Sequence, residues 1–99
     1  MTYDPVCTWT GASGTAYIYY VRPLGSALAP NQTGNFIYAK KNPEGDWLPI
    51  YIGQGDLSES ERQLLDARDA THVHMHLTMT EEARLAEERD LLARYPNEP

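Results

Sequence analysis

The segment 34-GNFIYAKKNPEGDWLPIYIG-53 has the pattern of a β-hairpin. Two runs rich in aromatic and aliphatic residues, 35–41 and 47–53, flank the turn sequence Asn-Pro-Glu-Gly at 42–45. In such a turn proline presets a negative φ and glycine tolerates a positive one. Pro49 has no backbone N–H to donate to a sheet ladder, so it indicates an edge position or a bulge. The segment therefore predicts two antiparallel strands joined by a tight turn.

The rest of the chain supplies further strands and two helices. The expected elements are strands at 16–22, 35–41 and 47–53, a helix at 59–69, a strand at 72–78 and a helix at 81–95. Ser58 and Glu61 have the spacing of a capping box for the first helix, and Thr80 can cap the second. Residues 1–15 show little periodicity and are expected to form an N-terminal arm, with a single α+β domain at 16–99.

Composition limits the classes of function. The chain has 99 residues, enough for one domain with a small core. Its 14 acidic and 8 basic residues give a formal charge of −6, which provides no general attraction to nucleic acid or anionic membranes. Cys7 is the only cysteine, and neither a secretory signal nor a membrane-length apolar run is visible. These features predict a soluble cytoplasmic protein without membrane partners.

Glu88 stands out in the last expected helix. At about 100° per residue, one apolar arc is formed by Leu85, Leu91, Leu92 and Tyr95. Glu88 falls near the middle of this arc, whereas Glu82, Glu87 and Asp90 fall outside it. A carboxylate on the core side needs a partner or a metal ion. Glu88 is therefore either a metal ligand or catalytic carboxylate, or a glutamate at the helix rim that reaches solvent.

Tyr51, Gly53 and Arg62 form a second group of candidates. Tyr51 and Gly53 share a strand face, and a glycine beside a tyrosine would leave a hollow that a ligand could approach. The alternative is a bulge glycine that ends the strand. Arg62 follows nine residues after Gly53 and could bring a guanidinium to the same hollow, where its fork of donors would suit a phosphate; otherwise it is a solvated arginine.

A row of histidines alternates with apolar residues in the strand at 72–78. His72, His74 and His76 share one face, and histidines two apart on a strand can bind zinc together. No cysteine or carboxylate in the same segment would complete such a site. Because the apolar residues occupy the other face, the histidine row is expected to face solvent or a partner.

Taken together, residues 34–97 resemble a GIY-YIG nuclease domain, over about two thirds of the chain. The segment 34-GNFIYA-39 stands in the place of the Gly-Ile-Tyr strand, and 51-YIG-53 is a literal Tyr-Ile-Gly. A helix with Arg62 follows, and 88-ERDLL-92 is similar to the family's glutamate helix. The resemblance implies an α+β fold with a three-stranded antiparallel core flanked by helices. The first expected strand would be an N-terminal addition.

The resemblance also implies hydrolysis of phosphodiester bonds with one divalent cation, magnesium or manganese. Glu88 would hold the metal, and Arg62 would stabilise charge on the phosphoryl group. Tyr51, with Tyr38 as a second phenol, would position or deprotonate the attacking water. The residues expected against the substrate are Gly53 and Phe36. The implied partner is nucleic acid, with DNA expected before RNA, and a protein partner could supply substrate affinity.

Two departures from the family pattern support other functions. Phe36 takes the place of the usual first tyrosine and lacks its hydroxyl, and the helix expected at 59–69 has no histidine or tyrosine after Arg62. A catalytically impaired relative that serves as a binding or interaction module is therefore the second hypothesis. A zinc-binding domain built on the histidine row is the third.

Overall fold

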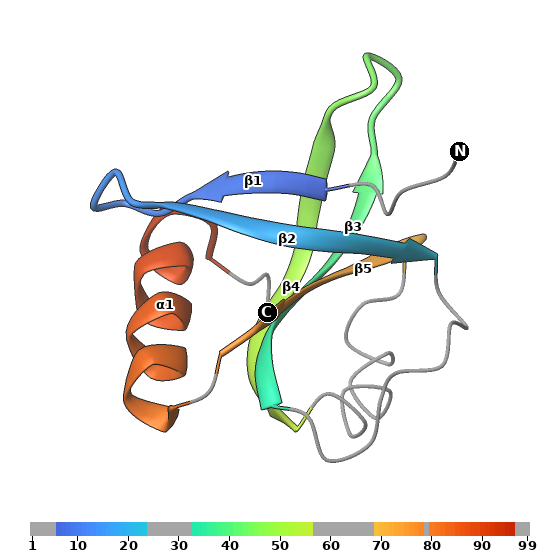
Figure 1. Cartoon of the computed structure of the whole chain (residues 1–99). Helices are drawn as coiled ribbons and strands as arrows, with labels where there is room; N and C mark the ends of the chain where they lie inside the picture. Colours follow the sequence, from blue (N-terminus) through green and yellow to red (C-terminus); the bar gives the residue numbers. More distant parts are fainter. Residues whose placement is uncertain (1–5, 24–32, 57–68, 79, 97–99) are drawn as a thin grey trace.

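The described residues of the chain fold into one antiparallel sheet and one helix (Figure 1). The computed structural model describes residues 6–23, 33–56, 69–78 and 80–96. The elements are β1 (Val6–Thr10), β2 (Ala16–Pro23), β3 (Thr33–Lys41), β4 (Trp47–Asp56), β5 (His72–Leu77) and α1 (Glu81–Arg94). The five strands lie in the order β1-β2-β5-β3-β4. The expected α+β class is confirmed, and the sheet is larger than the expected three-stranded core.

The β3–β4 hairpin follows the expectations from its sequence. Gly45 N–H donates to the Asn42 carbonyl at 2.9 Å, and Gly45 has a φ of 89° that favours glycine. β4 is an edge strand, and the pairing register shifts between Tyr38 and Ala39, where Pro49 enters the ladder. β4 therefore shows both the edge position and the pairing irregularity that are expected at a proline without an N–H.

The expected N-terminal arm is wrong for residues 6–10, which form β1. Thr8 pairs with Ile18 in an antiparallel ladder, and Gly14 adopts a φ of 91° in the connecting turn. Five residues are too few to show a clear period, so the sequence pattern does not reveal this strand. Burial of Trp9, which is 4% exposed, explains why this short strand packs on the sheet.

Apolar side chains cover both faces of the sheet. One face, here the helix face, is covered by α1, and its core consists of Trp9, Tyr19, Ile37, Ala39, Ile52 and Leu91. The other, here the far face, has a second cluster of Phe36, Tyr38 and Val73. Successive residues of a strand point to opposite faces, which separates Tyr38 from Ile37.

The histidine row lies on the helix face and not on a solvent face, which corrects the expectation. β5 is last of the strands in the chain but lies inside the sheet, between β2 and β3. His74 pairs with Ile37 and is completely buried. The alternation of β5 was correct; the strands that pair with it on both edges, and the helix that covers its histidine face, could not be inferred from the segment itself.

Helix α1 begins where expected but buries a different stripe. The Thr80 hydroxyl accepts from Ala83 N–H at 3.2 Å, as an N-cap does. Glu87 and Leu91 are its buried residues, whereas Leu85 is 37% exposed. The expectation that Glu87 lies outside the core-facing arc is therefore wrong. Leu91, Leu92 and Tyr95 of the apolar arc do pack on the core, whereas Leu85 is left exposed. Glu87 is buried instead because polar groups of the sheet satisfy its carboxylate.

Two further expectations concern the helix at 59–69 and the absence of a membrane span. The helix at 59–69, including Arg62, lies almost wholly outside the described residues. Across the described ranges, no helix combines the length and apolarity needed to span a membrane.

Candidate functional site

Tyr38 and Tyr51 lie side by side across the β3–β4 ladder. They are direct partners in the register, and both belong to the cluster on the far face. The Phe36 ring stacks on Tyr51 with centroids 6.3 Å apart and meets Tyr38 edge to face at 5.6 Å. Tyr51 is half-buried and Tyr38 is only 2% exposed. The hairpin thus brings the two expected phenols together, with Tyr38 in the core.

The hollow expected at Gly53 is filled by Phe36. A Cβ atom on Gly53 would lie 2.6 Å from Phe36 Cζ and 3.2 Å from Tyr51 Cε1. The absent side chain lets an aromatic ring of the same chain lie against the backbone. Gly53 and Phe36 are both buried, so the expectation of open space for a ligand at this point is wrong.

Glu88 is half-buried on the side of α1 that is turned toward β4. Arg84 Nε donates to Gln54 Oε1 at 3.2 Å, and Leu91 shares a core cluster with Ile52. Glu88 lies between Arg84 and Leu91 along the helix, so it comes level with residues 52–54 of β4. Partial burial raises the pKa of Glu88.

Glu88 and Tyr51 therefore approach the same part of an edge strand from different faces. The described residues do not bring the carboxylate and the phenol onto one face of the sheet. Arg62, the third expected member of the site, lies outside the described residues.

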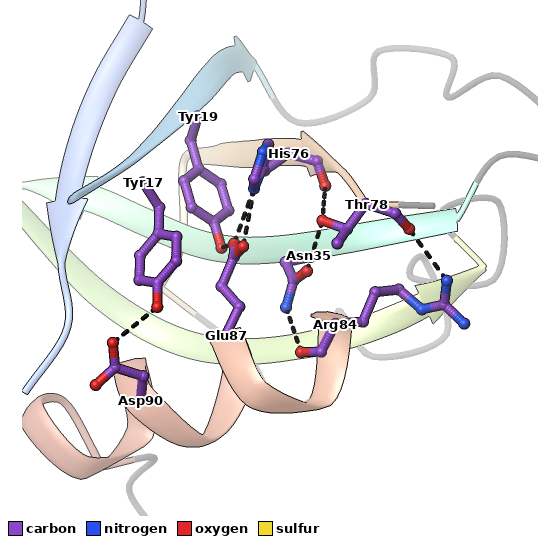
Figure 2. Close-up of polar contacts among 8 residues, drawn as sticks. All are labelled: Tyr17, Tyr19, Asn35, His76, Thr78, Arg84, Glu87 and Asp90. Carbon is purple, nitrogen blue, oxygen red and sulfur yellow. Dashed lines mark hydrogen bonds and ion pairs between the residues drawn. The ribbon is translucent and has the colours of Figure 1, made fainter. Parts of the chain in front are cut away.

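A buried carboxylate cluster that the sequence analysis missed joins α1 to β2 and β5. Glu87 is 5% exposed and accepts a hydrogen bond from the Tyr19 hydroxyl (Figure 2). His76 Nδ1 lies 3.0 Å from each oxygen of the same carboxylate. Burial, followed by the hydrogen bond and charge of Glu87, raises the pKa of Tyr19. These two donors compensate for removing the carboxylate from water.

A second carboxylate of α1 fastens the β1–β2 turn. The Tyr17 hydroxyl donates to Asp90 Oδ2 at 2.7 Å, and Ser13 donates through its N–H at 2.8 Å and its hydroxyl at 2.7 Å. Hydrogen bonds from the Ser13 hydroxyl, Tyr17 and the Ser13 amide lower the pKa of Asp90. Burial and then Asp90 raise the pKa of Tyr17 to about 12.

Buried Asn35 connects the start of α1 to the sheet. Its Nδ2 donates to the Arg84 carbonyl at 2.9 Å, and its Oδ1 accepts from the Thr78 hydroxyl at 2.9 Å. Arg84 Nη1 donates at 3.1 Å both to Thr33 Oγ1 and to the Thr78 carbonyl. Figure 2 shows this group beside the Glu87 cluster along one side of α1. Together the polar residues attach the helix to four strands, β2, β3, β4 and β5.

A pattern in the sequence points to these residues in retrospect. Tyr17 and Tyr19 share a face of their strand by alternation, and Glu87 and Asp90 are three apart on the helix. Two phenols opposite two carboxylates match in number and spacing. The sequence alone does not pair the phenols with the carboxylates, because that pairing depends on α1 packing beside β2.

His74 is held as a neutral ring by Trp9. The indole N–H is only a donor and lies 2.9 Å from His74 Nδ1, so Nδ1 accepts and the proton stays on Nε2. His74 Nε2 is buried without a hydrogen-bond partner among the described residues. Burial, and to a smaller degree the charge of His72, lowers the pKa of His74 to about 4. Within the described ranges, no group of three or more His, Cys, Asp or Glu could hold a metal ion.

Comparison with known proteins gives no independent assignment. No protein-family model matches the chain, and no match was found among curated proteins or solved structures.

Proposed function

We propose that β5, β3 and β4, with α1, form a GIY-YIG-like core that hydrolyses phosphodiester bonds in nucleic acid. In this proposal β1 and β2 are an N-terminal addition that widens the core. The adjacency of the three strands and the position of α1 directly after β5 in the chain are compatible with it. The pairing of the two motif strands, with Tyr38 opposite Tyr51, supports it further.

The observation that carries the proposal is the course of α1 along β4. Arg84 contacts Gln54 and Leu91 shares a core cluster with Ile52, so Glu88 is level with residues 52–54 of β4, next to Tyr51 in the strand. Because β4 is the edge strand, a substrate at this edge could meet groups from both faces. The proposed site is therefore the outer edge of β4, with Glu88 on one side and Tyr51 on the other.

The residue types suit this chemistry. Magnesium keeps several water ligands and is commonly held by one or two carboxylates together with substrate phosphates, so the single hard carboxylate of Glu88 fits it. A bound ion would supply charge stabilisation at the phosphate oxygens. Tyr51 would orient the attacking water, and the buried Tyr38 and Phe36 fix the position of its ring. Arg62 keeps its proposed role as a donor to the phosphoryl group.

Cleavage of plasmid and single-stranded DNA, and of RNA, with magnesium or manganese tests the proposal. We expect Glu88→Gln to lower the rate at least about a hundredfold, the usual loss when a transition-state contact is removed. Glu82→Gln is the matched control, because Glu82 is an exposed carboxylate on the same helix. Absence of cleavage by the unaltered protein with either metal, or equal rates for both variants, would contradict the proposal.

A catalytically impaired binding module is the second candidate. The buried Phe36 ring, packed against Gly53 where the family has a tyrosine, favours it. In that case the protein would bind nucleic acid without cutting it, and Phe36→Tyr would restore no cleavage.

A further inference from the structure

Three aromatic residues from distant parts of the chain surround an open hollow of about 330 Å³. Trp9 comes from β1, Trp47 from the start of β4, and Tyr95 follows the last turn of α1. The Trp9 and Tyr95 rings meet edge to face at 5.5 Å. Trp47 stands against the His72 and His74 rings at 4.9 and 4.6 Å. Packing therefore fixes these rings before any ligand arrives.

The polar groups at the hollow are few and specific. Asp46 and Thr8 line it together with the aromatic rings. Asp46 N–H donates to the Asn42 side chain at 2.9 Å, whereas the Asp46 carboxylate is exposed and has no partner among the residues described. A carboxylate is an acceptor only, so it selects a ligand edge made of donors.

Two cations stand close to the aromatic walls. Lys41 Nζ lies 5.0 Å from the Trp47 ring centroid, and the Arg94 guanidinium lies 5.2 Å from that of Tyr95. Arg94 also donates to the Thr10 carbonyl at 3.1 Å, which keeps it near β1. Aromatic faces with neighbouring cations are the parts from which single-stranded nucleic-acid sites are built.

We propose that this hollow binds an unpaired guanine base, with its ring against Trp47 and Tyr95 and its Watson–Crick edge at Asp46. Guanine presents two adjacent donors, N1–H and the N2 amino group, on that edge. Adenine and cytosine each place a ring acceptor beside their amino group, and uracil and thymine place an N–H between two carbonyls. Only guanine therefore offers the Asp46 carboxylate two hydrogen bonds.

This inference rests on the proposed nuclease function and names how such an enzyme would hold its substrate. A chain with a formal charge of −6 gains little from general phosphate attraction. Stacking on aromatic rings provides affinity that does not depend on the charge of the whole protein. Trp47 is four residues from Tyr51 along β4, roughly 13 Å at the rise of a strand, so one substrate strand could reach both places.

Tryptophan fluorescence measures binding directly, because both tryptophans of the chain line the hollow. The probes are GMP, AMP, CMP and UMP, added without divalent metal and excited at the red edge of the indole band. We expect GMP to bind at least tenfold more tightly than the other three. Raising salt fourfold should weaken GMP binding at most about threefold, as for release of one counterion.

Two variants separate the roles of carboxylate and ring. Asp46→Asn, at an exposed position, should leave the fold intact and reduce the preference for GMP over AMP at least tenfold. Tyr95→Ala should weaken all nucleotides about tenfold through lost stacking. Glu44→Gln, an exposed change in the same turn, should alter neither the preference for GMP over AMP nor the affinity for nucleotides.

The outcomes distinguish this inference from the proposed function. No fluorescence response to nucleotides at millimolar concentration, or equal binding of all four that Asp46→Asn does not change, overturns the guanine site. Cleavage that depends on Glu88 without such binding would uphold the nuclease and reject this site. Guanine binding without cleavage would uphold the site and reject the nuclease.

Discussion

Among single residues, Glu87 is the buried carboxylate through which the helix contacts two strands of the sheet. A carboxylate that is 5% exposed needs donors, and Tyr19 and His76 supply them from two different strands. The neighbouring Glu88 differs by about 100° around the helix and is only half-buried. One position along the sequence thus separates a structural carboxylate from the one we propose for chemistry.

Removing the Glu87 side chain should destabilise the fold. Glu87→Ala leaves the buried Tyr19 hydroxyl and His76 Nδ1 without their acceptor, and losing one partner of a buried polar pair costs about 3 kcal/mol. Urea denaturation at neutral pH measures the free energy of unfolding. Glu88→Ala is the matched control, with an expected loss below about 1 kcal/mol. Equal losses for the two variants would contradict the burial of Glu87.

His74 should make the protein sensitive to acid. Its pKa is lowered in the fold to about 4 from an ordinary value of 6.5, so the folded state binds a proton less readily than the unfolded chain. The stability it contributes is complete above about pH 6.5 and is lost as the pH falls toward 4, by up to about 3 kcal/mol. Protonation of Nδ1 would also displace the Trp9 hydrogen bond.

Urea denaturation between pH 7.5 and 4 checks this dependence. His74→Gln, whose side-chain oxygen could still accept from Trp9, should be less stable at pH 7.5 and should lose less on acidification. An unchanged pH slope in this variant would show that other groups cause the acid sensitivity. His72→Asn, at a partly exposed position in the same row, should keep most of the acid sensitivity, because burial is a larger cause of the lowered pKa of His74 than the charge of His72.

At the scale of elements, the sequence correctly predicts the features that depend only on neighbouring residues. The Asn42–Gly45 turn, the behaviour of Pro49 and the Thr80 cap each depend on residues within a few positions, and all were confirmed. The prediction of which helix residues are buried was wrong at Glu87, because burial there depends on hydrogen-bonding groups of the sheet. Leu91, Leu92 and Tyr95 pack on the core as the apolar arc predicts, but the buried face also includes Glu87, because hydrogen bonds to β2 and β5 satisfy its carboxylate.

The contact between the β1–β2 turn and α1 gives a test at this scale. A Cβ atom on Gly11 would collide with the Asp90 carboxylate, which is fixed by Ser13 and Tyr17. Gly11→Ala should therefore destabilise the fold by about 1–3 kcal/mol, the range for forced overpacking. Gly14→Ala tests the left-handed backbone at a φ of 91°, where no atom lies near. It should cost about 1–2 kcal/mol.

A double-mutant cycle separates collision from general weakness of the turn. In an Asp90→Ala background the carboxylate is absent, so Gly11→Ala should cost much less than in the unaltered protein. The cost of Gly14→Ala should be the same in both backgrounds. Additive effects of Gly11→Ala and Asp90→Ala would reject the contact, and thermal or urea denaturation provides all of these values.

For the whole molecule, the order of strands is what the sequence could not reveal. β5 pairs with β2, which is some fifty residues earlier in the chain, and with β3 (Figure 1). Such pairing depends on closing long loops and leaves no periodic trace in any one segment. The same insertion buries the histidine row and joins Trp9 to His74. Candidate residues could be named from motifs, but which of them meet depends on this order.

The N-terminal strand should be essential to the whole sheet and not a dispensable arm. Deleting residues 1–10 removes β1 and with it Trp9, which is 4% exposed and donates to His74. Loss of a buried tryptophan alone costs about 3–5 kcal/mol, a large share of the stability of a small domain. We expect the shortened chain to lose its cooperative urea transition. Deleting residues 1–5 alone is the control and should leave the transition in place, since β1 begins at Val6. If both shortened chains unfold at the same urea midpoint, β1 contributes no stability, and the claim that Trp9 stabilises the sheet is wrong.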